Sequence, residues 1–586
     1  MTKSVLGKYW SLKKYDEDFI SKLKLYLGID DFLARLISVR TSSIESAEHF
    51  LFPKIKSLLP DPFHLLDMQK AVDRTIKAVI DKEKICIFAD YDVDGATSAA
   101  LLKNVFRDLG MDATIYVPDR IIEGYGPTRE AMQKIKDFGT KLVITVDCGS
   151  VAFEALEYAT ELGLDVIVID HHISMDSLPD AIAIINPNRL DETSNCKNLA
   201  AVGVSFLFAV ALCKAFKDID YFRKNNFSPP ELMQYLDLVA LGTVCDVMIL
   251  TDLNRAFVAQ GLKVAKSRAN IGYCALSDVA NIQEVISTYH LGFILGPRIN
   301  AGGRVGKSTL GANLLSTTSL AEAREIAEEL DRYNEERKAI EYSVLAEAME
   351  LAKEQINELS LFIVGIGWHP GVIGIVAGRL KEKYNKPVAV IALNNNIGKA
   401  SCRSVRGVDF GGNIVEAKQK GLLIAGGGHA MAAGFTVDES KIEELKEFLR
   451  EKFARSLKST EFHLQEYYDL SLTSSAVNLD LIEQINKLEP LGNGNPTPVF
   501  MFSDVYVLKA DIVGTDHIKL MLAPQRDSFG SKPISAMAFG AASNELRSIL
   551  LSPKPYNLSV LGKLKVNKWQ DRETVQLIVE DVIVEK

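Results

Sequence analysis

Short apolar segments alternate with longer amphipathic segments through the first half of the chain. The apolar segments lie at residues 84–89, 113–118, 141–146, 165–169 and 181–185. Apolar residues with helical spacing follow three of these segments. They lie at about 97–109, in a stretch that ends at about 138, and at 151–163. Apolar runs without polar interruption are typical of strands buried on both faces of a parallel sheet. The alternation of strand and helix therefore predicts an α/β domain built on a doubly wound parallel sheet.

A change in pattern separates this domain from a second α/β unit. Residues from about 318 to 358 are rich in Ala, Glu, Leu, Lys and Arg, and Ser319 precedes Glu322 with the spacing of a capping box. These features predict a long helix that holds two domains apart and leaves a cleft between them. The second unit has strand patterns at 361–366 and 388–393 and a helical pattern at 372–384.

Shorter apolar or alternating runs, with Gly or Pro nearby, characterise the chain after about residue 460. They lie at 498–508, 517–523, 533–539, 556–566 and 574–584. Five strands of this length suit a small β-barrel. Tyr506, Phe500, Phe502 and Trp569 are candidates for base stacking. Alternation along a strand makes core positions the stronger interpretation for all four.

The length of 586 residues suits roughly three or four domains. The patterns predict an N-terminal helical extension packed on the first domain (1–80), the first α/β domain (81–315), a linker helix (316–358), the second α/β domain (359–457) and the β-barrel (458–586). The N-terminal extension carries few chemical groups, so the sequence indicates no function for it.

Composition narrows the class of protein. Hydrophobic residues make up 47% of the chain and charged residues 24%, which is typical of a globular protein with large cores. The seven cysteines form no CxxC pair and indicate reduced core residues of a cytoplasmic protein. No window has the ~18 apolar residues of a membrane span, so no membrane partner is expected. Since the net charge is −9, nucleic-acid binding requires a local basic path.

Three aspartates follow the first predicted strand at every second position. They are Asp90, Asp92 and Asp94, and Gly95 comes directly after them. If the backbone stays extended, alternate side chains point to one face and bring three carboxylates together at the carboxyl end of a strand. Carboxylates this close repel one another, and divalent cations such as Mg²⁺ or Mn²⁺ are the expected compensation. An acidic turn that ends the strand at Gly95 is the alternative interpretation.

Acidic and histidine side chains also end other apolar stretches. Asp147 follows the third predicted strand, Asp170, His171 and His172 follow the fourth, and Asp246 closes a later apolar stretch. Parallel strands carry their carboxyl ends to one edge, so these side chains are expected to converge with the three aspartates. A histidine pair after a strand often belongs to a loop whose polar groups are hydrogen-bonded within the protein. Four acidic strand ends in one sheet nevertheless favour a metal site. Carboxylates with one or two imidazoles suit Mn²⁺ or Mg²⁺ better than a structural zinc.

These segments, in this order, resemble the motifs of the DHH phosphoesterase superfamily. The matching motifs are Asp90-Tyr-Asp-Val-Asp-Gly95, Asp147-Cys-Gly149, Asp170-His-His172 and Gly242-Thr-Val-Cys-Asp246. Further matches narrow the resemblance to RecJ-type single-strand-specific exonucleases. They are Val117-Pro-Asp-Arg120 with Gly124-Tyr-Gly126, the segment Leu295–Arg304, the segment Trp368–Arg379 and the segment Gly426–Gly434. The resemblance runs from about residue 80 onward.

The resemblance implies a metal-dependent exonuclease that degrades single-stranded DNA from 5′ to 3′, to mononucleotides, in DNA repair and recombination. It implies two divalent cations, Mn²⁺ or Mg²⁺, a DHHA1-type second domain and an OB-fold barrel. It also suggests a single-strand-binding protein and a helicase as partners. One alternative is a DHH phosphodiesterase of short oligonucleotides or cyclic dinucleotides, which needs no barrel. Another is a repair scaffold that binds DNA without cutting it, which has no reason to keep an acidic cluster.

The resemblance also assigns roles to single residues. The metal ligands are Asp90, Asp92, Asp94, Asp147, His171 and Asp246, and the catalytic residues are Asp147, Asp170, His171 and His172. Asp147 is expected to bridge the cations, and His172 to contact the scissile phosphate or the leaving group. Asp170 orients a histidine or is itself a ligand. Many members have a His where this chain has Phe88, so Asp90 or a water is expected to fill that coordination position.

Residues in the remaining motifs are candidates for contacts with substrate phosphates. They are Arg120, Tyr125, Arg298, Arg304, Ser401, Arg403 and His429. Residues 302–309 resemble a P-loop, but its first glycine position is Ala301 and no buried strand precedes it. A turn whose two arginines face phosphates is the preferred interpretation there.

The consecutive glycines at 426–428 predict a second anion site. Their amides can approach an anion closely in a tight turn, beside His429 and Arg403. A turn without any ligand is the alternative. The sequence therefore predicts phosphate contacts in the second α/β domain and the metal site in the first.

Overall fold

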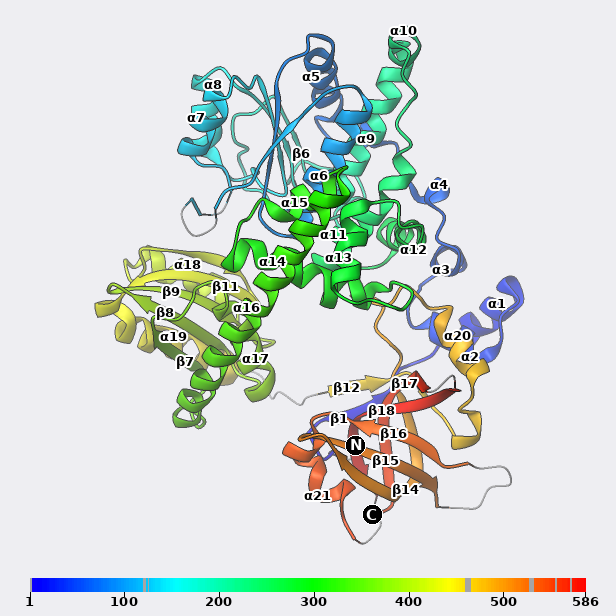
Figure 1. Cartoon of the computed structure of the whole chain (residues 1–586). Coiled ribbons are helices and arrows are strands. Elements are labelled where there is room, and N and C mark those ends of the chain that lie inside the picture. Colours follow the sequence, from blue (N-terminus) through cyan, green and yellow to red (C-terminus); the bar gives the residue numbers. More distant parts are fainter. Residues whose placement is uncertain are drawn as a thin grey trace.

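The computed structural model describes residues 3–119, 123–124, 126–458, 465–525, 532–553, 556–569 and 572–585. Figure 1 shows an α/β domain with most of the helices, a smaller α/β domain, and a β-barrel body that also contains the first helices of the chain. Helix α16 (Leu320–Glu354) runs from the first α/β domain to the second. Among the described residues, no helix combines the length and the apolarity that crossing a membrane requires.

The first α/β domain is built on a five-stranded parallel sheet. Its strands are β2 (Ile85–Ala89), β3 (Thr114–Tyr116), β4 (Leu142–Val146), β5 (Asp165–Ile169) and β6 (Ala183–Ile185), in the order β3-β2-β4-β5-β6. One face packs on α5 (Met68–Ile80), α6 (Val93–Asp108) and α9 (Ala201–Asp218), and the other on α7 (Arg129–Asp137) and α8 (Phe153–Glu161). Because helices cover both faces, the prediction of a doubly wound parallel sheet is confirmed.

Two local predictions in this domain are wrong. The apolar stretch before Asp246 forms helix α11 (Leu236–Cys245), not a strand, because a helix buried all round has the same unbroken apolar sequence as a buried strand. The expected turn at Arg298 and Arg304 is helix α14 (Gly296–Val305). Its glycines serve close packing, since a Cβ atom at Gly303 would lie 2.8 Å from the ring of Tyr91.

The second α/β domain has a mixed sheet. Its strands are β7 (Leu361–Ile366), β8 (Val388–Asn394), β9 (Ile397–Arg403), β10 (Ala425–His429) and β11 (Ala432–Asp438), in the order β10-β11-β9-β8-β7. Only β7 and β8 are parallel. Helices α17 (Ile373–Tyr384), α18 (Phe410–Gln419) and α19 (Ile442–Lys458) cover it. The glycines at 426–428 are part of strand β10, so the turn predicted there is wrong.

Long helix α16 was expected between the domains, and the structure has it. Ser319 is its N-cap and accepts a hydrogen bond from the amide of Glu322 at 3.3 Å, as the capping-box spacing indicated. At about 1.5 Å per residue, its 35 residues span roughly 50 Å. Helix α16 packs on α14 at one end and on α17 and β7 at the other.

The third body is a closed barrel. Its main strands are β14 (Phe500–Val513), β15 (His517–Pro524), β16 (Ile534–Ala538), β17 (Leu558–Trp569) and β18 (Arg572–Val584). They run in the order β14-β15-β16-β18-β17, and the pairing of β14 with β17 closes the sheet. The five predicted strands and the barrel are thus confirmed. Phe500 and Phe502 are buried in the barrel core, which agrees with the stronger interpretation of the two residues.

The N-terminal helices belong to the barrel body. Helices α1 (Glu17–Leu27), α2 (Asp31–Ser38) and α3 (Ile44–Leu51) share one hydrophobic core with the barrel strands. Strand β1 (Tyr9–Leu12) pairs in parallel with β12 (Gln465–Tyr468). The expectation that this extension packs on the first domain is therefore wrong for α1 and α2, whereas α3 also contacts the first domain through Arg255, whose guanidinium lies 3.8 Å from the ring of Phe50. No local pattern reveals the true partner, because it lies more than four hundred residues away in sequence.

Candidate metal centre

The loop between β2 and α6 carries the first aspartates. Asp92 is the N-cap of α6, and its Oδ1 accepts hydrogen bonds from the amides of Asp94 at 2.9 Å and Gly95 at 3.1 Å. The backbone therefore turns into a helix here. The alternating pattern assumed an extended backbone, and that assumption is wrong. A Cβ atom at Gly95 would collide with the carbonyl oxygen of Asp90, so only glycine fits this turn.

Asp94 lies in the first turn of α6 and is buried against the start of α9. Its two carboxylate oxygens accept hydrogen bonds from the amides of Ala201 at 2.7 Å and Val202 at 2.9 Å. These amides have no partner within their own helix, and the positive end of the helix dipole favours a carboxylate. The interaction fixes the Asp94 side chain at the edge of the sheet. Sequence reasoning missed both amide donors, because backbone groups leave no residue signature.

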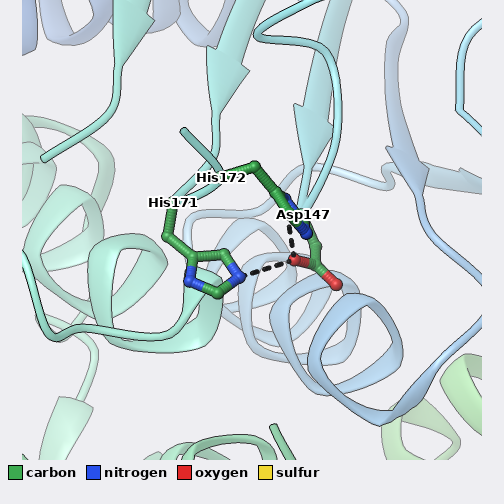
Figure 2. A group of neighbouring side chains, drawn as sticks. All are labelled: Asp147, His171 and His172. Atoms are coloured by element: carbon green, nitrogen blue, oxygen red, sulfur yellow. Dashed lines mark ion pairs between the residues drawn. The ribbon is translucent and has the colours of Figure 1, made fainter. Parts of the chain in front are cut away.

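Asp147 follows β4 with a left-handed backbone. Its φ is +61°, and its side chain is buried. A non-glycine residue in this region costs free energy and persists where the surrounding structure holds it. The conformation turns the carboxylate towards the neighbouring strand ends, where Figure 2 shows it with His171 and His172. Strain at this position is consistent with a functional constraint on Asp147.

Asp170 holds the two histidines in place. Its Oδ1 lies 2.8 Å from Nδ1 of His172 and accepts hydrogen bonds from the amides of His171 at 2.7 Å and His172 at 3.1 Å. Its Oδ2 accepts from the amide of Ser150 at 3.0 Å. Both carboxylate oxygens of Asp170 are therefore engaged in hydrogen bonds. Of the two roles that the sequence left open for Asp170, orienting His172 is favoured over direct ligation of a metal.

The two histidines have opposite electrostatic environments. Burial, followed by the charge of His172, lowers the pKa of His171 to about 4. Burial also lowers the pKa of His172, but the hydrogen bond with Asp170 outweighs it and raises the pKa to about 9. His171 is therefore neutral at neutral pH, with a lone pair available for a cation, whereas His172 is an imidazolium that can donate a proton.

The aspartates and His171 converge on one point. Nε2 of His171 lies 3.3 Å from Oδ1 of Asp147, 3.4 Å from Oδ2 of Asp246 and 3.8 Å from Oδ2 of Asp94. One ligand atom each of Asp90, Asp92 and Asp147 also lies within 4.8 Å of the others. Asp147 thus belongs to both groups, which is the arrangement expected of a bridging carboxylate.

The donor atoms fit divalent cations. Nε2 of His171 and Oδ2 of Asp246 are buried, face each other and have no hydrogen-bond partner in the described part of the chain. Adjacent ligands about 2.1 Å from an octahedral cation lie about 3.0 Å apart, close to the separations seen here. Burial, and after it the charges of neighbouring aspartates, raises the pKa of Asp94 and Asp147 and raises that of Asp246 to about 7. Cations would remove this electrostatic cost.

Phe88 does not contribute to the cluster. It lies in β2 with its ring stacked on Tyr116 at 5.5 Å, in the core below α7 and α8. Asp90, two residues later, belongs to the group with Asp92 and Asp147. That Asp90 fills the position of the histidine found in many relatives stays a prediction, supported by this placement.

A polar segment after β6 supports the histidines, and sequence reasoning missed it. Asn186 donates from Nδ2 to Oγ of Ser150 at 2.7 Å and to the carbonyl of His172 at 2.8 Å, and Asn188 donates to the carbonyl of His171. Both asparagines follow the last predicted strand of the first sheet. The signal that identified the aspartates, a polar residue directly after an apolar run, would also have identified these.

Two of the four candidates for phosphate contacts in the first domain are described, and both make contacts within the protein. Arg120 and Tyr125 lie outside the described residues. Arg298 bonds Asp331 of α16 through Nε at 2.8 Å, which favours a structural role. Arg304 donates from Nη1 to the carbonyl of Gly371 at 2.9 Å and so connects α14 to the second domain.

The second domain brings Ser401, Arg403 and His429 to one face of its sheet. Across β9, β11 and β10, Arg403 pairs with Ala432 and Ala432 with His429, while Ser401 pairs with Gly434 and Gly434 with Gly427. Residues two apart on a strand share a face, so both rows point the same way. Glycines between the side chains leave backbone exposed. Arg403 contacts Oγ of Ser401 at 3.3 Å and makes no ion pair with a carboxylate of the described residues.

Comparison with known proteins places this geometry in a family. Sequence models match for the DHH family, N-terminal domain, at residues 84–243, the DHHA1 domain at 354–455 and the RecJ OB domain at 468–581. The single-stranded-DNA-specific exonuclease RecJ of Bacillus subtilis is 32% identical in an alignment of 586 positions that covers 98% of this chain and 71% of the relative. The chain belongs to the RecJ family.

Other RecJ proteins match as broadly. RecJ of Salmonella typhimurium is 34% identical over 95% of this chain and 97% of its own length. The crystal structure of RecJ in complex with Mn²⁺ from Thermus thermophilus matches with a TM-score of 0.82 and 25% identity, over 98% of this chain and 80% of that one. The RecJ architecture of DHH domain, DHHA1 domain and OB barrel is therefore present, and a metal-bound relative agrees with the donor atoms described above.

Proposed function

We propose that this chain is a metal-dependent exonuclease that degrades single-stranded DNA in repair and recombination. The proposal depends on one observation above all. Carboxylates and one neutral histidine converge at the edge of a parallel sheet, in a chain that aligns over nearly its whole length with single-stranded-DNA-specific exonucleases. A scaffold that binds DNA without cutting it would gain nothing from a buried acidic cluster that lowers its stability.

Asp147 is the proposed bridge between two cation positions. Asp94, His171 and Asp246 form one group of donor atoms and Asp90, Asp92 and Asp147 form another, and Asp147 also lies 3.3 Å from His171 of the first group. Two divalent ions, Mn²⁺ or Mg²⁺, held by these residues would supply an activated water and would neutralise charge at phosphorus. The carboxylates and His171 would hold the ions at the edge of the sheet.

His172 is the proposed proton donor. Its Nδ1 is bonded to Asp170, and Nε2 is the ring atom that we assign to the scissile phosphate or the departing 3′ oxygen. A pKa of about 9 keeps the imidazole protonated at neutral pH, and in that form it can stabilise negative charge or give up a proton. Asp170 contributes by holding the ring, since a carboxylate that hydrogen-bonds Nδ1 fixes both the orientation and the tautomer.

Recognition of a 5′ end is assigned to the second domain. A terminal 5′-phosphate carries more charge and more free oxygens than an internal phosphate and is best bound by a guanidinium with further donors. This chemistry is provided by Arg403, which has no carboxylate partner among the described residues, together with Ser401, His429 and the exposed glycine backbone. Degradation from 5′ to 3′ with release of mononucleotides follows if this pocket holds the end while Asp147 acts on the first internal phosphate.

The barrel is proposed to hold the strand behind the cleavage site. OB barrels bind single strands through a groove and stacked bases. Phe500 and Phe502 are core residues and do not serve this purpose, and Tyr506 is only half-buried. The side chain of Trp569 lies outside the described residues. A cytoplasmic location, a single-strand-binding protein and a helicase as partners belong to the same proposal.

Digestion of labelled substrates tests the function directly. Single strands labelled at the 5′ or the 3′ end, a duplex, an RNA and a dinucleotide are incubated with the protein and Mn²⁺ or Mg²⁺. Rapid release of the 5′ label as a mononucleotide, with the duplex intact, is the expected result. Faster hydrolysis of the dinucleotide than of long strands would assign the chain to the phosphodiesterase alternative. No hydrolysis of any substrate with either metal would contradict an enzymatic function.

A further inference from the structure

The segment directly after Asp246 is bound by a loop of the barrel body. The amide of Leu250 donates to the carbonyl of Asn493 at 2.8 Å. In return, Nδ2 of Asn493 donates to the carbonyl of Val247 at 2.7 Å. Two glycines beside Asn493 allow this approach, because a Cβ atom at Gly492 would lie 2.7 Å from the side chain of Leu250. A barrel loop thus bonds the residue that follows a member of the metal cluster.

Val247 has an unusual backbone for its residue type. Its φ is +58°, and it follows the last turn of α11, where its amide donates to the carbonyl of Val244 at 3.1 Å. Glycine is the common residue at such a helix end, and a β-branched residue there is strained. The Val247 side chain is 64% exposed, so burial does not hold it in place. The peptide group between Val247 and Met248 is held on both sides, because its carbonyl accepts from Asn493 and its N–H donates to the carbonyl of Thr243 at 3.1 Å.

The loop that carries Asn493 is itself well fixed. Asn495 donates to the carbonyls of Leu488 and Pro490 at 2.7 and 2.9 Å, and Arg40 donates to Oδ1 of Asn495 at 3.0 Å. Arg255, which is 1% exposed on α12 (Asp252–Lys266), donates to four carbonyls of the barrel body. These carbonyls belong to Phe50, Leu488, Glu489 and Pro490. The loop is therefore a rigid support next to Asp246.

We propose that Asn493 is a positioning residue for the Asp246 carboxylate, so that the barrel body helps to assemble the metal cluster. The proposal rests on the function proposed above, because it takes Asp246 as a metal ligand. Asp246 immediately precedes Val247, whose backbone is strained, so a change in the φ of Val247 alters the end of α11 that carries the Asp246 carboxylate, 3.4 Å from His171. Groups that support metal ligands typically affect metal affinity by about 10–100-fold.

Mn²⁺ binding to the full-length protein, followed by calorimetry, tests the proposal. Asn493→Ala and Asn493→Asp both remove the Nδ2 donor, and both are expected to weaken Mn²⁺ binding by about 10-fold or more. The affinity for single strands in the presence of a chelator should stay within about 2-fold of wild type, and kcat should fall with little change in KM. Asn486→Ala, an exposed asparagine of α20 (Leu479–Asn486), is the matched control with no expected effect.

Rescue separates positioning from a merely structural role. Val247→Gly removes the strain at φ +58°, so the double variant Asn493→Ala with Val247→Gly is expected to regain most of the lost Mn²⁺ affinity. Unchanged Mn²⁺ affinity in both Asn493 variants, absence of rescue, or a parallel loss of strand binding and thermal stability would each overturn the proposal. Mn²⁺ binding is measured without any substrate, so a failure of the proposed exonuclease activity is recognised separately.

Discussion

The two α/β domains carry opposite charges at their candidate sites. At the edge of the first sheet, buried carboxylates face one another, and their pKa values are raised by burial and by their mutual repulsion. On the face of the second sheet, Arg403 is partly buried without a carboxylate partner among the described residues, and burial lowers its pKa. The first site calls for cations and the second for an anion. A phosphodiester strand with divalent metals satisfies both requirements at once.

This difference shows why the two sites stay apart in one chain. If Arg403 stood beside Asp147, the two charges would neutralise each other, and neither metal nor phosphate would be needed. Helix α16 keeps them on separate sheets, and Arg304 of α14 reaches across to the carbonyl of Gly371. Each site therefore remains electrostatically unsatisfied until its ligand arrives. Changing one charge at each site tests this difference.

The largest effect is expected from Asp147→Ala. Loss of the shared carboxylate disrupts both groups of donor atoms, so turnover should fall by at least about 10³-fold. Strand binding in the presence of a chelator should be preserved, because Arg403 and the barrel are unchanged. Single-turnover hydrolysis and a binding titration on the same preparation measure the two effects. Near-normal turnover would end the two-metal interpretation.

A smaller and more selective effect is expected from Arg403→Ala. Loss of a charge-assisted contact to a terminal phosphate costs about 1–3 kcal/mol, or about 5–150-fold in kcat/KM on strands with a 5′-phosphate. Strands with a 5′-hydroxyl should be affected much less. Arg455→Ala serves as the control, since Arg455 is an exposed arginine of α19 that lies near Glu451. An equal loss on both strands would place Arg403 on the general path of the backbone.

The smallest effect concerns stability without metal. Burial raises the pKa of Asp147, so the metal-free fold loses stability as pH rises from the unfolded pKa of about 3.9 towards the higher folded value. Asp147→Asn should therefore stabilise the metal-free protein by about 1–2 kcal/mol at pH 8 and leave it unchanged near pH 4. Denaturant unfolding with a chelator measures this. Wild type should regain the difference when Mn²⁺ is added, whereas the variant should gain little.

A second stability measurement completes the comparison. Arg403→Ala removes a cation instead of a repelled carboxylate, so no metal-dependent change in stability is expected from it. A loss of Mn²⁺-dependent stabilisation in Arg403→Ala, like the one expected for Asp147→Asn, would contradict the separation of the two sites.

The sequence predicted the centre of the site better than its edges. Asp147 and His171 were identified because an apolar run marks a buried strand, and the end of such a strand has a known place in a parallel sheet. Asp94 and Asp246 were expected at strand ends, but they lie at the start of α6 and the end of α11. Their convergence was predicted from the wrong local geometry, since an apolar run does not distinguish a buried helix from a buried strand.

Other features had no local signal at all. The glycines of α14 and β10 resembled turn residues, yet they lie in a helix and a strand, and in α14 Gly296 and Gly303 allow a close approach to Cys245 and Tyr91, which are distant in sequence. The bond from Asn493 to Val247 joins two loops separated by more than two hundred residues. Such contacts depend on how whole domains dock, and the order of residues along one segment contains no information about that.

The shared core of the N-terminal helices and the barrel has a consequence for synthesis on the ribosome. Helices α1 to α3 emerge first, but the strands that cover them begin only near residue 465, roughly 410 residues later. At about 5–20 residues per second, the apolar faces of these helices wait some 20–80 s for their partners. Throughout that interval the nascent chain exposes an apolar surface, and we expect chaperones to protect it until Asp581 closes the body by bonding Ser4 and Trp10.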